Sequence, residues 1–303
     1  MNSIVITGGS GLLALNWAFA KRSSSNVLLG LHNKSASISG VISKNIDLNS
    51  KVNFLKCLDE FKPEFVIHTA GLTNIDICEQ DPGLAKKVNV DLAVNVCQAC
   101  KSLGIPMVQI STDNLFSGNE SLVDELHPVN PVNIYGATKA EAEARILDIM
   151  DDVLILRTNF YGWGPVYKPS FSDMIINELR KENPITLFTD VFYTPILIAE
   201  LVGATENLLN LDARGIFNVV GDERLSKFEF GIKLAKKFNL NSNLIRAGKL
   251  KDRKDLANRP FDMSLSNQKT CKFIGRNIGN VDSHLSNLQQ QEESTFYYEV
   301  QQV

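Results

Sequence analysis

The sequence predicts an α/β protein built on a doubly wound parallel sheet. Short apolar runs alternate with helical patterns through the first half of the chain. Those runs are apolar almost throughout, which is typical of strands buried on both faces. A glycine-rich turn, Gly8-Gly9-Ser10-Gly11, joins the first strand to the first helix. With 303 residues the chain can bury a large core.

We expect six strands in the first half, at about residues 4–7, 26–32, 41–47, 64–71, 106–112 and 153–157, with helices at 49–61, 82–103 and around Tyr135. The pattern loosens after Phe160. We therefore predict one domain over residues 1–160 and a smaller part over 161–303, with segments around 190–220 returning to the sheet. This part should hold a helix over 170–183 and one from Ser226, which Glu229 caps. The Gln-rich tail after Ser283 is expected to be a helix with a frayed end.

Composition excludes several classes of partner. The net charge is −3, so no basic excess indicates nucleic acid or an anionic membrane. No apolar run approaches the roughly 20 residues that span a bilayer. The chain enters a strand directly without a signal-like leader, and a cytoplasmic location is the default expectation. Five scattered cysteines give no disulfide framework. Cys97 and Cys100 have C-x-x-C spacing without a second pair, so we expect buried thiols and no metal site.

The glycine turn favours a dinucleotide, because amides at a helix start can bind a diphosphate. The second strand ends in Leu31-His32-Asn33-Lys34. No carboxylate is present there to bind a ribose 2′-hydroxyl, and Lys34 could pair with a 2′-phosphate. This favours NADP(H), with NAD(H) possible. The alternative is a loop of solvated polar residues.

Tyr135 and Lys139 are four residues apart, so they share one face of the predicted helix. A cation beside a phenol lowers its pKa and suits it to proton transfer. A Tyr packed under a solvated Lys is the plain structural alternative. His68 lies in an apolar strand, where a hydrogen-bonded core histidine is favoured over a catalytic one.

Taken together, the motifs resemble those of the extended short-chain dehydrogenase/reductases with a Rossmann fold, and most closely the dTDP-4-dehydrorhamnose reductase group. The resemblance extends to about Gly275 and rests on the ordered segments 7–14, 75–82 with Asn89, 111–118, Glu125 with Pro131, 135–139, 157–161 and 259–260. The chain departs from the group at three places. Asn114 replaces a Tyr, Phe160 replaces a Trp, and residues 68–72 replace N-A-A-A-H. These three places are expected near the substrate, so they bear on which sugar is bound more than on the reduction itself.

The resemblance implies an NADPH-dependent reductase that acts on the 4-keto group of a nucleotide-linked 4-keto-6-deoxyhexose, and a homodimer is possible. It implies that Tyr135 protonates the carbonyl oxygen, that Lys139 lowers the Tyr pKa and holds the nicotinamide ribose, and that Thr112 hydrogen-bonds the same oxygen. The expected cofactor residues are Gly8, Ser10, Gly11, Leu12, Leu13, His32, Asn33, Lys34, Asp47, Leu48, Thr69, Ala70, Gly71, Thr73, Tyr135 and Lys139. The expected substrate residues are Asn114, Asn159, Phe160, Trp163 and Arg259.

Two other functions stay open on the same fold. Dehydratases of the superfamily resemble this chain at Thr112 but carry a Glu where Asn114 stands, and an amide cannot act as that base. Epimerisation at the sugar 4-position is not excluded in this way. The second function that stays open, after epimerisation, is that of a non-catalytic NADP-binding relative similar to the β subunit of methionine adenosyltransferase.

Overall fold

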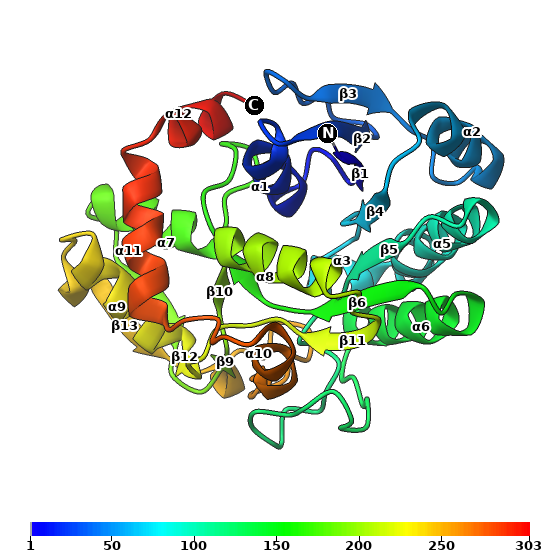
Figure 1. The fold of residues 1–303 in the computed structure, drawn as a ribbon. Helices are drawn as coiled ribbons and strands as arrows, with labels where there is room; N and C mark the ends of the chain where they lie inside the picture. Colours follow the sequence, from blue (N-terminus) through cyan, green and yellow to red (C-terminus); the bar gives the residue numbers. More distant parts are fainter. Residues whose placement is uncertain (1) are drawn as a thin grey trace.

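The computed structural model describes residues 2–303 and contains a central sheet of seven parallel strands in the order β11-β6-β5-β4-β1-β2-β3 (Figure 1). The strands are β1 (Asn2–Thr7), β2 (Ser25–Leu31), β3 (Ile42–Asn45), β4 (Phe65–His68), β5 (Met107–Ile110), β6 (Val153–Arg157) and β11 (Gly215–Asn218). All six predicted strands are present. The seventh comes from the second half of the chain and pairs in parallel with β6.

Helices cover both faces of this sheet (Figure 1). One face packs against α2 (Lys51–Phe61), α5 (Leu92–Leu103) and α6 (Ile134–Ile149), and the other against α1 (Leu12–Lys21) and α8 (Ile198–Asn210). Alternation along β1 shows why: Ile4 and Ile6 enter the core under α1 and α8, whereas Val5 enters the opposite core. The doubly wound architecture is therefore confirmed.

The strand order reverses at β1, which lies between β2 and β4. Chain crossovers lead away from β1 in both directions, so a crevice opens at the carboxyl ends of β1 and β4. All the sheet pairs next to it are parallel, and each of these strands ends at the same edge. Ligands of such folds bind at this point.

The predicted helix over residues 82–103 is not continuous. It divides into α4 (Pro82–Lys86), a π-helical turn (Lys87–Asp91) and α5, and a short helix α3 (Ile75–Gln80) precedes it. Asn89 lies within the π-helical turn. Its side chain accepts from the Leu72 amide at 2.8 Å and donates to the Thr138 hydroxyl at 3.0 Å. The turn therefore ties the loop after β4 to α6.

The second half adds a smaller layer beside the sheet. It contains α7 (Phe171–Arg180), α9 (Lys227–Lys237) and the short strand pairs β7 (Phe160–Tyr161) with β10 (Ile196–Leu197), β8 (Ile185–Phe188) with β13 (Ile245–Gly248), and β9 (Phe192–Tyr193) with β12 (Leu225–Ser226). Ser226 and Glu229 form the predicted capping box at the start of α9. β11 belongs to the main sheet and α8 packs against that sheet, while the boundary at residue 160 stays a prediction.

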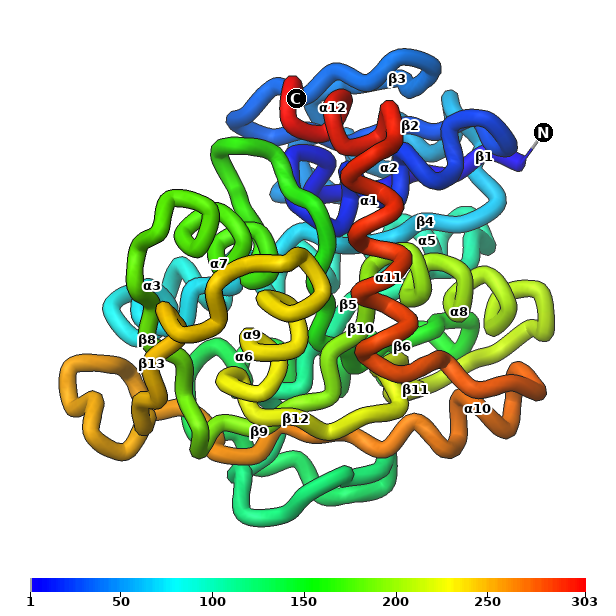
Figure 2. Tube along the Cα trace, turned by 90° about the vertical axis from the view of Figure 1, so that its left-hand side faces the viewer, coloured from blue at the N-terminus to red at the C-terminus, as the bar shows by residue number. Residues whose placement is uncertain are grey.

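The Gln-rich tail forms two helices, and the expectation of one frayed helix was wrong. Figure 2 shows α11 (Val281–Glu292) crossing the molecule and α12 (Thr295–Gln302) ending close to α1. The helix before them, α10 (Gln268–Ile274), packs against α8. Leu285, Leu288 and Val300 are buried. The apolar residues of the tail are few, and only contacts with elements far away in the sequence show that these three are buried.

Within residues 2–303, no helix is both long enough and apolar enough to pass through a bilayer. The same residues contain no cluster of His, Cys, Asp or Glu that could hold a metal ion. Cys97 and Cys100 are fully buried free thiols within α5. Burial raises the pKa of Cys97 to about 11, so it stays protonated and unreactive at neutral pH.

Candidate active site

A central cavity of about 360 Å³ lies at the carboxyl ends of the strands. Thr112 from the end of β5 and Tyr135 and Lys139 from α6 all line it. Two other groups of predicted residues line the same space: Gly11, Leu12, Leu13, Thr69, Ala70, Gly71 and Thr73 on one side, and Asn114, Asn159 and Phe160 on the other. The fold thus brings these residues together from five segments of the chain.

The start of α6 is fixed by two polar side chains. Asn133 caps the helix by accepting from the Gly136 amide at 2.8 Å, and Glu79 of α3 accepts from the Ile134 amide at 2.6 Å. A Cβ at Gly136 would collide with the Asn114 carbonyl, so only Gly lets α6 approach this closely. These contacts hold Tyr135 at the cavity.

The pairing of Tyr135 with Lys139 differs from the expectation. Burial raises the pKa of Tyr135 to about 12, and the Thr112 hydroxyl partly opposes this. Lys139 is not among the groups that shift this pKa, and its ammonium donates to the Ile110 carbonyl at 2.7 Å. Burial also lowers the pKa of Lys139 to about 8. Both groups face the cavity, but the ammonium is engaged by the backbone of β5.

A buried ion pair behind α6 was missed in the sequence. Arg157 donates to Glu143 with Nη2–Oε2 at 2.7 Å, and Ser111 donates to the same carboxylate. Glu143 opposes the lowering of the Lys139 pKa. Glu143 follows Lys139 by one helical turn, but helical spacing alone could not indicate an arginine on β6 as its partner. The network links α6 to the ends of β5 and β6.

Asp113 holds two asparagine side chains that line the central cavity. This fully buried carboxylate accepts from Asn114 Nδ2 at 2.8 Å and from Asn159 Nδ2 at 2.5 Å. Burial raises its pKa, and a cation on α9, Lys227, partly opposes the shift. Both amides are therefore held in fixed orientations at the cavity wall. Sequence reasoning assigned no role to Asp113 and did not single out Lys227.

The glycine turn fits a dinucleotide diphosphate. Gly8 has φ +72°, and a Cβ there would lie 2.7 Å from the Ala70 amide nitrogen. The first turn of α1 has neither a capping side chain nor an acidic residue, so its amides remain available to an anion. The residues present thus fit the diphosphate of NADP(H) or NAD(H).

A second cavity of about 250 Å³ adjoins the first and shares Ala70 with it. His32 and Leu48 line it together with Gly8, as expected, and so does Lys87 of the π-helical turn. It has the position expected for the adenosine end of a dinucleotide.

Four predicted cofactor residues line neither cavity. Lys34 lies over the Tyr167 ring, 2.9 Å from its centroid, and Tyr167 donates to the Ser10 carbonyl at 2.9 Å. Asp47 accepts from the Asn49 amide and side chain, and Asn33 is exposed. Lys34 therefore contacts an aromatic ring of the second half, a partner that no local pattern could indicate.

His68 is a core histidine, as favoured. It is 1 % exposed, and its Nδ1 lies 2.7 Å from the Thr7 hydroxyl. Burial, followed by the charge of Lys139, lowers its pKa to about 3. The neutral ring therefore joins the ends of β1 and β4 beneath the glycine turn.

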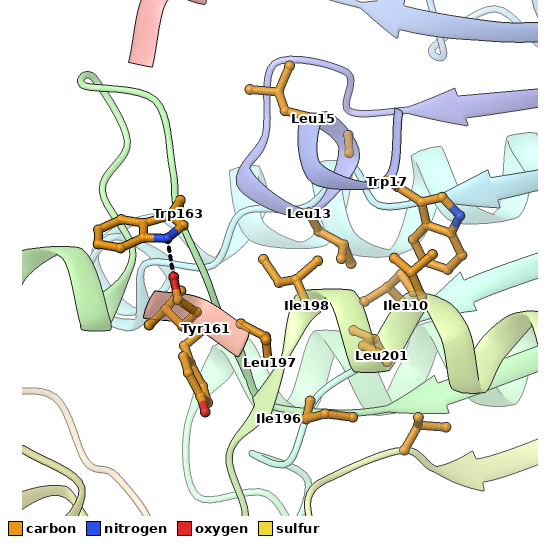
Figure 3. Packing of buried hydrophobic residues seen from close by; sticks show 14 of the residues in the cluster. Leu13, Leu15, Trp17, Ile110, Tyr161, Trp163, Ile196, Leu197, Ile198 and Leu201 are labelled. Carbon is orange, nitrogen blue, oxygen red and sulfur yellow. Dashed lines mark hydrogen bonds between the residues drawn. The ribbon is translucent and has the colours of Figure 1, made fainter. Parts of the chain in front are cut away.

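The expectation for Trp163 was wrong. Phe160 lines the central cavity, but Trp163 is 1 % exposed and donates its indole N–H to the Leu288 carbonyl at 2.9 Å. Figure 3 shows it among buried side chains of the core shared by α1 and α8. The chain turns inward after β7, so Trp163 packs the tail helix α11 against the sheet.

A third cavity, of about 470 Å³, adjoins the central one through Ile75, Asn114 and Asn159. We call it the basic cavity because Lys227, Arg253 and Arg259 line it. Arg259, a predicted substrate residue, pairs with Asp76 at 2.7 Å. The central cavity is thus open to a ligand longer than one sugar.

Comparisons with known proteins find relatives of two kinds. The chain is 26% identical over 259 residues to a probable low-salt glycan biosynthesis reductase of Haloferax volcanii, covering 84% of this chain and 86% of that protein. It is 27% identical over 194 residues to the β subunit of methionine adenosyltransferase 2 of Bos taurus, covering 62% of this chain and 58% of that protein.

Among solved structures, a dTDP-4-dehydrorhamnose reductase of Bacillus anthracis in complex with NADP has the same fold. Its TM-score is 0.83 at 23% identity, with 96% of this chain and 100% of that chain covered. The model of the RmlD substrate binding domain matches residues 1–293, and so includes all of α11. By fold, site and this match, the chain belongs to the RmlD substrate binding domain family.

Proposed function

We propose that this protein is an NADPH-dependent reductase of the 4-keto group of a nucleotide-linked 4-keto-6-deoxyhexose. One observation carries the proposal: Thr112, Tyr135 and Lys139 line one cavity together with the glycine turn. The Haloferax relative is named as a reductase in glycan biosynthesis, and the Bacillus structure is named as a dTDP-4-dehydrorhamnose reductase with NADP. Both names agree with this chemistry.

The dinucleotide would supply the hydride when bound, held by the α1 amides, Gly8 and the residues after β4. Tyr135 has a pKa of about 12 and is therefore protonated at neutral pH, as a proton donor to the carbonyl oxygen must be. The Thr112 hydroxyl donates to the same oxygen as negative charge develops on it. Lys139 places a positive charge in the same cavity.

The test is to mix the purified protein with NADPH and a 4-keto-6-deoxyhexose linked to dTDP or UDP, and to follow loss of the nicotinamide absorbance. Tyr135→Phe removes only the hydroxyl, so it should fold and bind NADPH but lose at least about a hundredfold in turnover. Turnover by Tyr135→Phe close to that of the wild type would contradict the assignment of the proton donor.

A second candidate function is regulation of a partner enzyme without catalysis, which the similarity to the bovine β subunit favours. It differs from reduction in one outcome of the same assay. A regulatory protein would bind NADPH but would oxidise none of it with any 4-keto sugar nucleotide tried. Epimerisation would instead convert a 4-hydroxy sugar nucleotide without net consumption of NADPH.

A further inference from the structure

Lys227 is the one lining cation of the basic cavity that has no carboxylate partner among the described residues. Arg253 is paired with both oxygens of Asp255, and Arg259 with Asp76. No Asp or Glu is found among the described residues that line this cavity. Among the described residues of the lining, the positive charge without a paired carboxylate is therefore that of Lys227, which is free to meet a ligand.

Aromatic rings hold the Lys227 ammonium in place. It lies 3.3 Å from the centroid of Tyr193 and 4.8 Å from that of Phe171. Such cation–π contacts only partly replace water around an ammonium. Burial accordingly lowers the pKa of Lys227 to about 8, although the charge of Asp113 acts in the opposite direction. An anion in the cavity would supply the missing partner.

The cavity also has the shape of a two-part site. Beside the cations, its lining is largely apolar and includes the rings of Phe171 and Phe188, which could pack against a flat base. Asn114 and Asn159 mark the border with the central cavity, where Thr112 and Tyr135 lie. A ligand across this border would place a sugar at Tyr135 and its anionic link at Lys227.

We propose that Lys227 binds the diphosphate of the nucleotide-linked substrate and selects for this anionic link. The proposal rests on the proposed function, since it concerns the far end of the same substrate. It assigns a residue that is absent from the motifs in the sequence. Charge-assisted hydrogen bonds of an ammonium to a diphosphate are among the stronger polar contacts in binding sites.

The experiment is calorimetric titration of the NADP⁺-loaded protein with dTDP and with UDP. Lys227→Met keeps the aliphatic chain against the rings but removes the charge, and should weaken binding of the better nucleotide about tenfold to a hundredfold. Lys227→Arg should stay within a few fold of the wild type. Lys236→Met is the matched control, because Lys236 is exposed on the same helix. NADP⁺ affinity and melting temperature should stay unchanged in all three variants.

The outcomes separate this assignment from the proposed function. Equal nucleotide binding by the wild type and Lys227→Met would overturn the role of Lys227 and leave the reductase proposal intact. Equal weakening in Lys227→Met and Lys227→Arg would show that packing matters and charge does not, which also overturns it. If the wild type binds neither nucleotide, both the assignment and the nucleotide-linked substrate are wrong.

Discussion

Acid should destabilise this protein through His68. The native ring has a pKa of about 3, whereas a free histidine titrates near 6.5. Between these values the unfolded chain binds more protons than the native one, so stability falls as the pH falls from 6.5 towards 3. Between about pH 7 and about pH 4 this one group should remove about 3 kcal/mol of unfolding free energy.

Other groups titrate over the same range, so the measurement must isolate the histidine. His68→Asn keeps a hydrogen-bonding group for Thr7 but cannot titrate. The volume that it removes lowers stability by an amount independent of pH. Urea unfolding of both proteins at about pH 7 and about pH 4 gives the difference between them, in which the shared titrations cancel.

We expect the stability advantage of the wild type over His68→Asn to shrink by about 3 kcal/mol at the lower pH. The NADPH affinity of the wild type should also fall at the lower pH, because His68 contacts Thr7, which directly precedes Gly8 of the glycine turn. A difference that changes by less than about 1 kcal/mol would refute the burial of a neutral ring at this position.

Three further predictions follow from single contacts. Phe160→Ala should raise the KM for the sugar nucleotide with little change in melting temperature, whereas Trp163→Ala should cost about 3–5 kcal/mol of stability, because that indole is buried. NADPH should bind more tightly than NADH in a cofactor fluorescence titration, since no carboxylate follows β2. Glu143→Gln should cost about 3–5 kcal/mol in urea unfolding, because it leaves the Arg157 charge buried without its partner.

Each of these has a result that would contradict it. A large loss of stability in Phe160→Ala with an unchanged KM would place that ring in the core. Equal affinities for the two cofactors would mean that the loop after β2 does not reach the ribose. For the ion pair, Glu141→Gln is the control, since Glu141 pairs with Lys86 on the surface and should matter by less than about 1 kcal/mol. Similar losses of unfolding free energy in Glu143→Gln and Glu141→Gln would contradict a larger contribution from the buried ion pair.

The sequence by itself determined the sheet and the place of the site. Strand runs buried on both faces and a glycine turn after the first strand are local signals, and they correctly indicated six strands and a crevice at their carboxyl ends. The spacing of Tyr135 and Lys139 placed both on one face of a helix, which holds because helical geometry is set within a few residues. The capping box of α9 could be predicted for the same reason, since Ser226 and Glu229 are only three residues apart.

Only the tertiary structure decided which side chains meet. The ammonium of Lys139 turns to the Ile110 carbonyl, and Trp163 lies under α11, because each contact depends on an element far away in the sequence. The partners of Glu143 and Lys227 likewise come from other strands and helices. The burial that sets the pKa values of Tyr135 and His68 is a sum over such packing, and no local pattern encodes it.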